Sequence, residues 1–236
     1  MPQHFVLDRP SWIPYLYLCL VAACAGQPLQ PTPASLPTVS LAEAREWAAN
    51  TAPQGHRLIR FRWLFNDGQA SVGGQGSARM AGPDSMRFDI AGPWGIGGAA
   101  AVVVGEDARW VRPPDIIARL IPSYPLMWAM FGVMRPPPPG ARVRGRHDDA
   151  FTAVEWIQGA DTVRYRRRTA SAGTFWAEWQ RAGVTMGVVE TRLDAGGAPV
   201  SARLTVPSVP ARLDLTIVAD STPAGFPAAL WAPPAP

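Results

Sequence analysis

Prolines and glycines occur along the whole of this 236-residue chain and together make up about a fifth of it. Because both residues interrupt helices, a mostly helical protein is excluded. Ten tryptophans and a hydrophobic share of 47% still supply enough apolar surface for a packed core. The length fits one large β-rich domain or two small ones. We therefore expect short strands joined by frequent turns.

Alternation of apolar and charged residues marks the strands. Residues 57–65 alternate cleanly, and the turn at 66–68 predicts a hairpin into a second strand over 69–80. Turn signals continue at a spacing of about 8–12 residues, which predicts a single antiparallel meander with one apolar face. The inward residues expected in the first and last strands are Ile59, Phe61, Trp63 and Phe65, and Ala211, Leu213, Leu215 and Ile217.

Two segments interrupt this pattern. Ser40 and Glu43 form a capping box, which predicts a short helix ending near Asn50. The segment 115–134 is apolar almost all round, and its two prolines, Pro122 and Pro125, would divide it into two short helices. Such a segment must be covered by apolar surface. It is either ordinary core filling or a lid over a lipid cavity, since methionine-rich surfaces adapt to hydrophobic ligands.

A hydrophobic stretch over 12–23 precedes Cys24. It is too short for a transmembrane helix but fits the apolar region of a signal peptide. The sequence Leu-Val-Ala-Ala before Cys24 resembles the lipobox of bacterial lipoproteins, in which the cysteine is diacylated. We expect a lipoprotein signal peptide over 1–23, the lipidated cysteine and a proline-rich tether over 24–39, and the folded domain over 40–236. An ordinary signal peptide is the alternative.

The sequence contains no recognisable catalytic motif. After Cys24, the histidines His56 and His147 are far apart, and neither a nucleophile elbow nor a two-histidine metal spacing is present. Residues 147–149, His-Asp-Asp, read as a polar turn, because adjacent strand residues point to opposite faces. We therefore expect a protein that is not an enzyme and uses no metal or cofactor.

All 22 basic residues are arginine, and the formal net charge is +4. This bias is typical of a GC-rich genome, so the charge alone does not indicate a nucleic-acid partner. Two rows of arginines share a strand face each. A solvated convex face explains them, and a patch for anionic lipid head groups is the alternative. The rows are Arg142, Arg144 and Arg146, and Arg164, Arg166 and Arg168.

Over residues 41–220 the order of these features resembles the LolB family of outer-membrane lipoproteins and their relatives with a LolA-type fold. The most specific match is 87–95, which ends in Pro93-Trp94-Gly95. Family members have a Pro-Leu-Gly turn there, with an exposed leucine that inserts into the membrane. The insert at 113–139, with Gly132-Val-Met-Arg-Pro136, and the closing strand at 211–220 are further matches.

The resemblance implies a mostly β fold with helices (α+β), in which one curved antiparallel sheet, an incomplete β-barrel, is closed by short helices. It implies a monomeric outer-membrane lipoprotein on the periplasmic face, with no nucleic-acid partner. Such a protein accepts the acyl chains of lipoproteins from a LolA-like periplasmic carrier and inserts them into the inner leaflet of the outer membrane. The alternatives are a related envelope lipoprotein that binds another lipid, and a structural or interaction lipoprotein without a transport role.

Two groups of site residues follow from this interpretation. Pro93, Trp94 and Gly95 would form the membrane hook, with Trp94 in the place of the leucine, unless Trp94 folds back onto its own sheet. Seven apolar residues would line the acyl-chain cavity. They are Ile59, Phe61, Trp63, Leu126, Met130, Leu213 and Leu215.

If Cys24 is the lipidated residue, a palmitate analogue supplied to growing cells labels the protein, and the Cys24→Ala variant carries no label. The reason is that the analogue can be attached only to a cysteine that the lipoprotein pathway has processed. Gel fluorescence of the purified protein measures the label. Equal labelling of both proteins would contradict the assignment.

Overall fold

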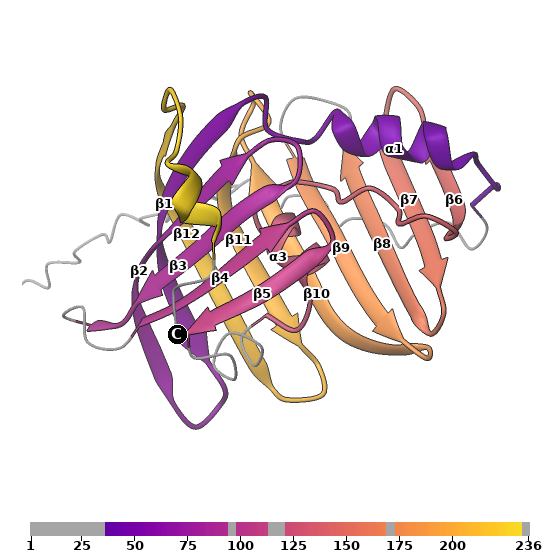
Figure 1. Ribbon diagram of the computed structural model, residues 1–236. Coiled ribbons are helices and arrows are strands. Elements are labelled where there is room, and N and C mark those ends of the chain that lie inside the picture. Colours follow the sequence, from indigo (N-terminus) through magenta and orange to yellow (C-terminus); the bar gives the residue numbers. More distant parts are fainter. Residues whose placement is uncertain (1–35, 94–97, 113–120, 169–172, 233–236) are drawn as a thin grey trace, which may run out of the picture. The chain divides into compact units, whose positions relative to one another are not determined.

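The computed structural model describes residues 36–93, 98–112, 121–168 and 173–232, which form one compact unit with a 12-stranded antiparallel sheet (Figure 1). The helices are α1 (Leu41–Ala49), α3 (Tyr124–Ala129) and the short 3₁₀-helix η2 (Ala228–Trp231). The strands are β1 (His56–Asn66), β2 (Ser71–Ala81), β3 (Ser85–Ala91), β4 (Gly98–Val104), β5 (Asp107–Arg112), β6 (Arg142–His147), β7 (Phe151–Gln158), β8 (Asp161–Arg168), β9 (Gly173–Arg181), β10 (Val184–Leu193), β11 (Pro199–Val206) and β12 (Ala211–Ser221).

The first and last strands lie in the middle of the sheet. β1 pairs with both β2 and β12, so the order runs β5-β4-β3-β2-β1-β12-β11-β10-β9-β8-β7-β6. Each half is the meander that the turn spacing predicts. β5 and β6 are consecutive in the chain but form opposite edges of the sheet. The segment between them, which contains α3, therefore leads from one edge to the other.

The sheet is curved and open rather than closed by helices (Figure 1). Within the described ranges, α1 contacts β6, and α3 contacts β9 and β10. The expectation that short helices close the sheet is wrong, because the described helices are few and short and leave the sheet open. α3 has only six residues, with Pro125 in its first turn and Gly132, at a φ of +74°, three residues after its end. The other helix expected in the insert falls mainly in 113–120, outside the described residues.

Edge strand β6 is covered by the chain that leads into α1. The amide N–H of Gly145 donates to the carbonyl of Pro37 at 2.9 Å, and that of Val39 donates to Val143 at 3.4 Å. α1 follows with the expected capping box between Ser40 and Glu43. These bonds satisfy backbone groups that would otherwise remain open to pairing with another chain.

The two faces of the sheet differ as the alternation predicts. In β1, Ile59 and Phe61 are completely buried, whereas Arg60 and Arg62 are exposed. Residues of the same face in β1–β4 and β6–β12 join α3 in one hydrophobic core. No helix in the described part of the chain is both long and apolar enough to cross a membrane.

Glycines in β2 let two large rings of β1 lie across that strand. Phe61 and Trp63 face Gly76 and Gly74 in the β1–β2 register. The indole N–H of Trp63 reaches over β2 and donates to the carbonyls of Gln75 and Ala91, both at 3.1 Å. A Cβ at Gly74 would lie 2.0 Å from the carbonyl oxygen of Ala91. The absence of a side chain is therefore a packing requirement.

Gly74→Ala is expected to destabilise the fold, because the new methyl group would collide with backbone rather than with a movable side chain. Overpacking of this kind costs about 1–3 kcal/mol, which lowers the melting temperature by roughly 3–10 °C in a domain of this size. Thermal unfolding followed by circular dichroism measures the change. Gln75→Ala, at an exposed position of the same strand, serves as the control and should melt like the wild type.

Candidate functional site

The centre of the apolar face is occupied by α3 and the residues that follow it. Five of the six residues of α3 are buried. A Cβ at Gly187 of β10 would lie 2.6 Å from Cδ1 of Leu126, so the glycine permits close approach of the helix. The buried hydroxyl of Thr191, also on β10, donates to the carbonyl of Ala129 at 2.8 Å. These contacts fix α3 against the sheet.

The insert also contacts the opposite half of the sheet. The ring of Phe131, just after α3, lies 5.9 Å from that of Phe61 on β1 and 6.2 Å from that of Phe88 on β3, measured between centroids. Phe61 and Phe88 stack on each other at 5.3 Å. The insert thus packs on β9 and β10 through α3 and on β1 and β3 through Phe131. The apolar faces of both halves meet around it.

Arg135 secures the end of the insert, and the sequence analysis gave it no role. It is 5% exposed, and its guanidinium donates to the carbonyls of Pro83 at 3.3 Å and Gly105 at 2.9 Å. These carbonyls belong to the β2–β3 and β4–β5 turns. The guanidinium also lies 5.0 Å from the ring centroid of Trp128 in α3. Burial lowers the pKa of Arg135.

All seven residues expected to line a cavity lie in the same hydrophobic core. Five come from the sheet, in β1 and β12, and two come from the insert. Phe61, Leu126 and Met130 are fully buried, and Trp63, at 8%, is the most exposed of the seven. The insert side chains themselves cover the apolar face here. An acyl chain would therefore have to displace these insert side chains to reach the sheet.

Of the other predicted site residues, only Pro93 lies within the described ranges. Pro93 is exposed at the end of β3. Trp94, Gly95 and Cys24 are not among the described residues. The polar turn expected at 147–149 is present: the carboxylate of Asp148 accepts the N–H groups of Ala150 and Phe151. Within the described ranges, no group of three His, Cys, Asp or Glu residues could hold a metal ion.

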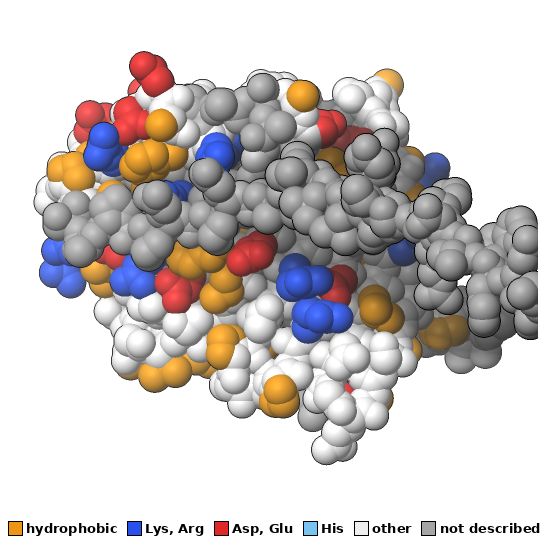
Figure 2. Space-filling view, turned by 180° about the vertical axis from the view of Figure 1, so that it is seen from behind, with side chains coloured by type: hydrophobic (Ala, Val, Ile, Leu, Met, Phe, Trp, Pro, Cys, Tyr) orange, Lys and Arg blue, Asp and Glu red, His pale blue; other side chains and the backbone are white. Residues whose placement is uncertain are grey.

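On the charged face, several of the arginines form cross-strand ion pairs. Arg164 on β8 binds Glu155 on β7 at 2.6 Å and Glu178 on β9 at 3.1 Å, and Arg144 on β6 approaches Glu155 at 3.7 Å. Burial lowers the pKa of Arg164, but the hydrogen bonds to Glu155 and Glu178 and the negative charges of these carboxylates together raise it more. Figure 2 likewise shows basic and acidic side chains interspersed. These pairs favour the solvated-face interpretation over an unpaired basic patch.

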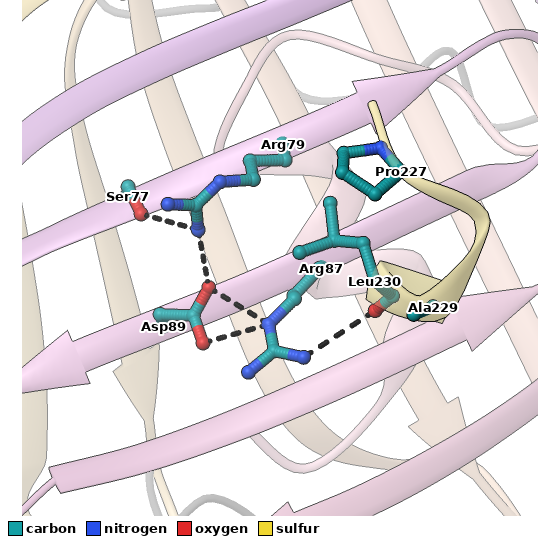
Figure 3. Close-up of a pocket in the computed structure, with 7 residues that line it drawn as sticks. All are labelled: Ser77, Arg79, Arg87, Asp89, Pro227, Ala229 and Leu230. Carbon is teal, nitrogen blue, oxygen red and sulfur yellow. Dashed lines mark hydrogen bonds and ion pairs between the residues drawn. The ribbon is translucent and has the colours of Figure 1, made fainter. Parts of the chain in front are cut away.

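A shallow pocket lies where η2 packs on the charged face of β2 and β3. Arg79 and Arg87 both point to Asp89, which lies between them and binds them at 2.7 and 2.9 Å (Figure 3). Arg87 also donates to the carbonyl of Leu230 at 3.3 Å. The two cations share one counter-ion, and Arg87 anchors the C-terminal segment. The charged groups of this pocket therefore serve to hold η2 on the sheet.

The comparisons with known proteins support the fold. Neither a protein-family model nor a curated protein matches the sequence. Among solved structures, a LolA superfamily protein from Nitrosomonas europaea matches with a TM-score of 0.54 and 14% identity, over 82% of this chain and 98% of that one. The chain has a LolA-type fold. An outer membrane lipoprotein-sorting protein domain from Vibrio parahaemolyticus matches with a TM-score of 0.35 and 8% identity, over 80% of this chain and 94% of that one.

Arg135→Lys is expected to destabilise this LolA-type fold, because a single ammonium group cannot bind two carbonyls and cover the Trp128 ring as a planar guanidinium does. Loss of these interactions should cost about 1–3 kcal/mol and lower the melting temperature by several degrees. Arg142→Lys, at an exposed position of β6, is the matched control. Equal melting temperatures for the two variants would show that Arg135 does not anchor the insert.

Proposed function

We propose that the protein is a non-enzymatic lipoprotein of the bacterial envelope that binds an acyl chain between its apolar sheet face and the insert. The observation that carries this proposal is the continuous apolar face, covered by a methionine-rich insert. The LolA-type fold supports it, because the structure that shares this fold is described as a LolA superfamily protein.

The chemistry of the covered face suits an unbranched hydrocarbon. The buried hydroxyl of Thr191 is satisfied by the carbonyl of Ala129. Tyr165 and Trp128 also bring a hydroxyl and an indole N–H into this otherwise apolar core. An acyl chain needs no hydrogen-bond partner, and each buried CH₂ group contributes about 0.8 kcal/mol. A long chain therefore gains enough free energy to compete with the insert for the same surface.

The insert is suited to yield this surface. Met127, Met130 and Met134 are buried in it, and the unbranched, flexible methionine side chain repacks around different neighbours at low cost. Its helix has only six residues. Helices this short gain their stability from packing rather than from their own hydrogen bonds. Displacement of α3 would therefore require replacing its apolar contacts and breaking the hydrogen bond from Thr191 to Ala129.

The finer part of the proposal is a LolB-like role. Cys24 would anchor the protein in the outer membrane, facing the periplasm, and Trp94 would enter the inner leaflet as a hook. The protein, acting as a monomer, would take lipoproteins from a LolA-like carrier and deliver them to that leaflet. A related envelope lipoprotein that binds another hydrophobic ligand is the second candidate, favoured by the tryptophan in place of the hook leucine.

A fluorescent fatty acid titrated into the full-length protein is expected to saturate at about one probe per chain. Thr191→Val should raise the apparent affinity about fivefold, because it removes a hydrogen bond worth about 1 kcal/mol that holds α3 in place. Thr216→Val, at an exposed position on the charged face of β12, is the control and should leave the affinity unchanged.

The absence of a saturable signal would favour a structural lipoprotein whose apolar face is only its core. Saturable binding that Thr191→Val leaves unchanged would place the ligand away from α3. Both results are distinct from a loss of folding, which circular dichroism of each variant reports separately.

A further inference from the structure

A second pocket, of about 190 Å³, lies where the C-terminal end of α1 meets β6, β7 and β8. Arg167 of β8, on the core face, and its neighbour Arg168 both line it, and Trp47 of α1 forms one wall. The remaining polar groups are the side chains of Asn50, Thr51, His147 and Thr152. Unlike the pocket of Figure 3, in which Asp89 lies between two arginines, this one has no carboxylate among its described lining residues.

Arg167 is a cation without a counter-ion. Its side chain is partly buried, on the same sheet face as the core, and it forms neither an ion pair nor a hydrogen bond with any described residue. Burial lowers the pKa of Arg167, and no neighbouring charge opposes this effect. A partly desolvated guanidinium of this kind favours an anionic partner.

The negative groups near the pocket are already occupied. The carbonyl of Ala48, at the end of α1, accepts both the N–H and the hydroxyl of Thr51, at 3.0 and 2.8 Å. The carboxylate of Asp148, in the β6–β7 turn, binds the side chain of Arg146 at 2.8 Å as well as two backbone N–H groups. The guanidinium of Arg167 also lies beside Gly197 of the β10–β11 turn, where the carboxylate of Asp194 accepts the N–H groups of Gly196 and Ala198.

The donors are arranged around a small space. Thr152, at the base, is 9% exposed, and its hydroxyl lies 2.7 Å from Nδ1 of His147. His147, Asn50 and Arg168 are exposed at the rim, while Arg167 is deeper. The guanidinium of Arg167, the imidazole of His147 and the amide of Asn50 can together bind the several oxygens of a phosphate group, whereas a carboxylate offers only two.

We propose that this pocket binds a phosphate group. Arg167 faces Phe175 across the β8–β9 register, and Tyr165, two residues earlier on the same face, is in the hydrophobic core. The pocket thus borders the apolar face. A lipid with a phosphate in its head group would place that phosphate at Arg167 and its acyl chain along the core. This second statement rests on the proposed function, whereas phosphate binding itself does not.

The test measures binding to the full-length protein by isothermal titration calorimetry with three probes. They are inorganic phosphate, a lysophosphatidic acid, and the monoacylglycerol with the same acyl chain. Lysophosphatidic acid should bind at least about tenfold more tightly than the monoacylglycerol, because charge-assisted bonds to phosphate are strong. Arg167→Gln should abolish that difference, and Arg167→Lys should restore part of it.

Two further variants keep the test interpretable. Arg62→Gln removes the same charge from an exposed position on the opposite face and should leave the difference between the lipids intact. Arg168→Gln changes an exposed rim residue, so it should preserve the fold and reduce the difference by a smaller factor. Circular dichroism confirms the fold of each variant.

The outcomes separate the two proposals. Equal affinity for both lipids, unchanged in Arg167→Gln, would overturn the phosphate site and leave acyl-chain binding standing. Binding of inorganic phosphate that depends on Arg167, without saturable binding of either lipid, would support the site for a free phosphate and overturn the proposed function. Loss of the lipid preference in Arg62→Gln would show a general effect of net charge and would overturn the site.

Discussion

The structure depends on how one large apolar face is kept from water. Strands β1–β4 and β6–β12 present that face, and its burial is the dominant favourable term in folding. A closed barrel would cover it by wrapping the sheet onto itself, but here β5 and β6 remain edges. The insert covers it instead. Its central residues pack on both halves, through Leu126 against β10 and through Phe131 against Phe61 and Phe88.

In the described part of the insert, polar groups hold the C-terminal end of α3 and the residues that follow it. A helix on an apolar surface still has backbone groups that need partners. Thr191 supplies one for the carbonyl of Ala129. Arg135 instead uses its side chain to bind the carbonyls of Pro83 and Gly105 in two turns of the sheet. Between these points the N–H of Met134 donates to the hydroxyl of Thr51 at 2.7 Å, and the side chains of Met130, Phe131 and Val133 are buried. The described part of the cover therefore combines a few polar attachments with flexible apolar side chains.

The sequence predicted those parts of the fold that depend on local patterns. The inward residues of β1 and β12, the capping box at Ser40 and the turn positions all follow from periodicity or turn chemistry. The pairing of β1 with β12, more than 140 residues apart in the chain, leaves no local signal. The role of Arg135 was also not predictable, because its partners are backbone carbonyls, which every residue has. A long apolar run followed by a single arginine was the available hint.

The arginine rows show why a row of like charges cannot be interpreted without its neighbours. Arg164 and Arg167 are three residues apart on one strand and therefore face opposite sides. Arg164 lies on the solvated side between Glu155 and Glu178, which neutralise it. Arg167 faces the core side at the edge of the apolar surface, where the neighbouring strands contribute Thr152 and Phe175. The partner strands, and not the basic residue itself, determine which arginine is structural and which is available for a ligand.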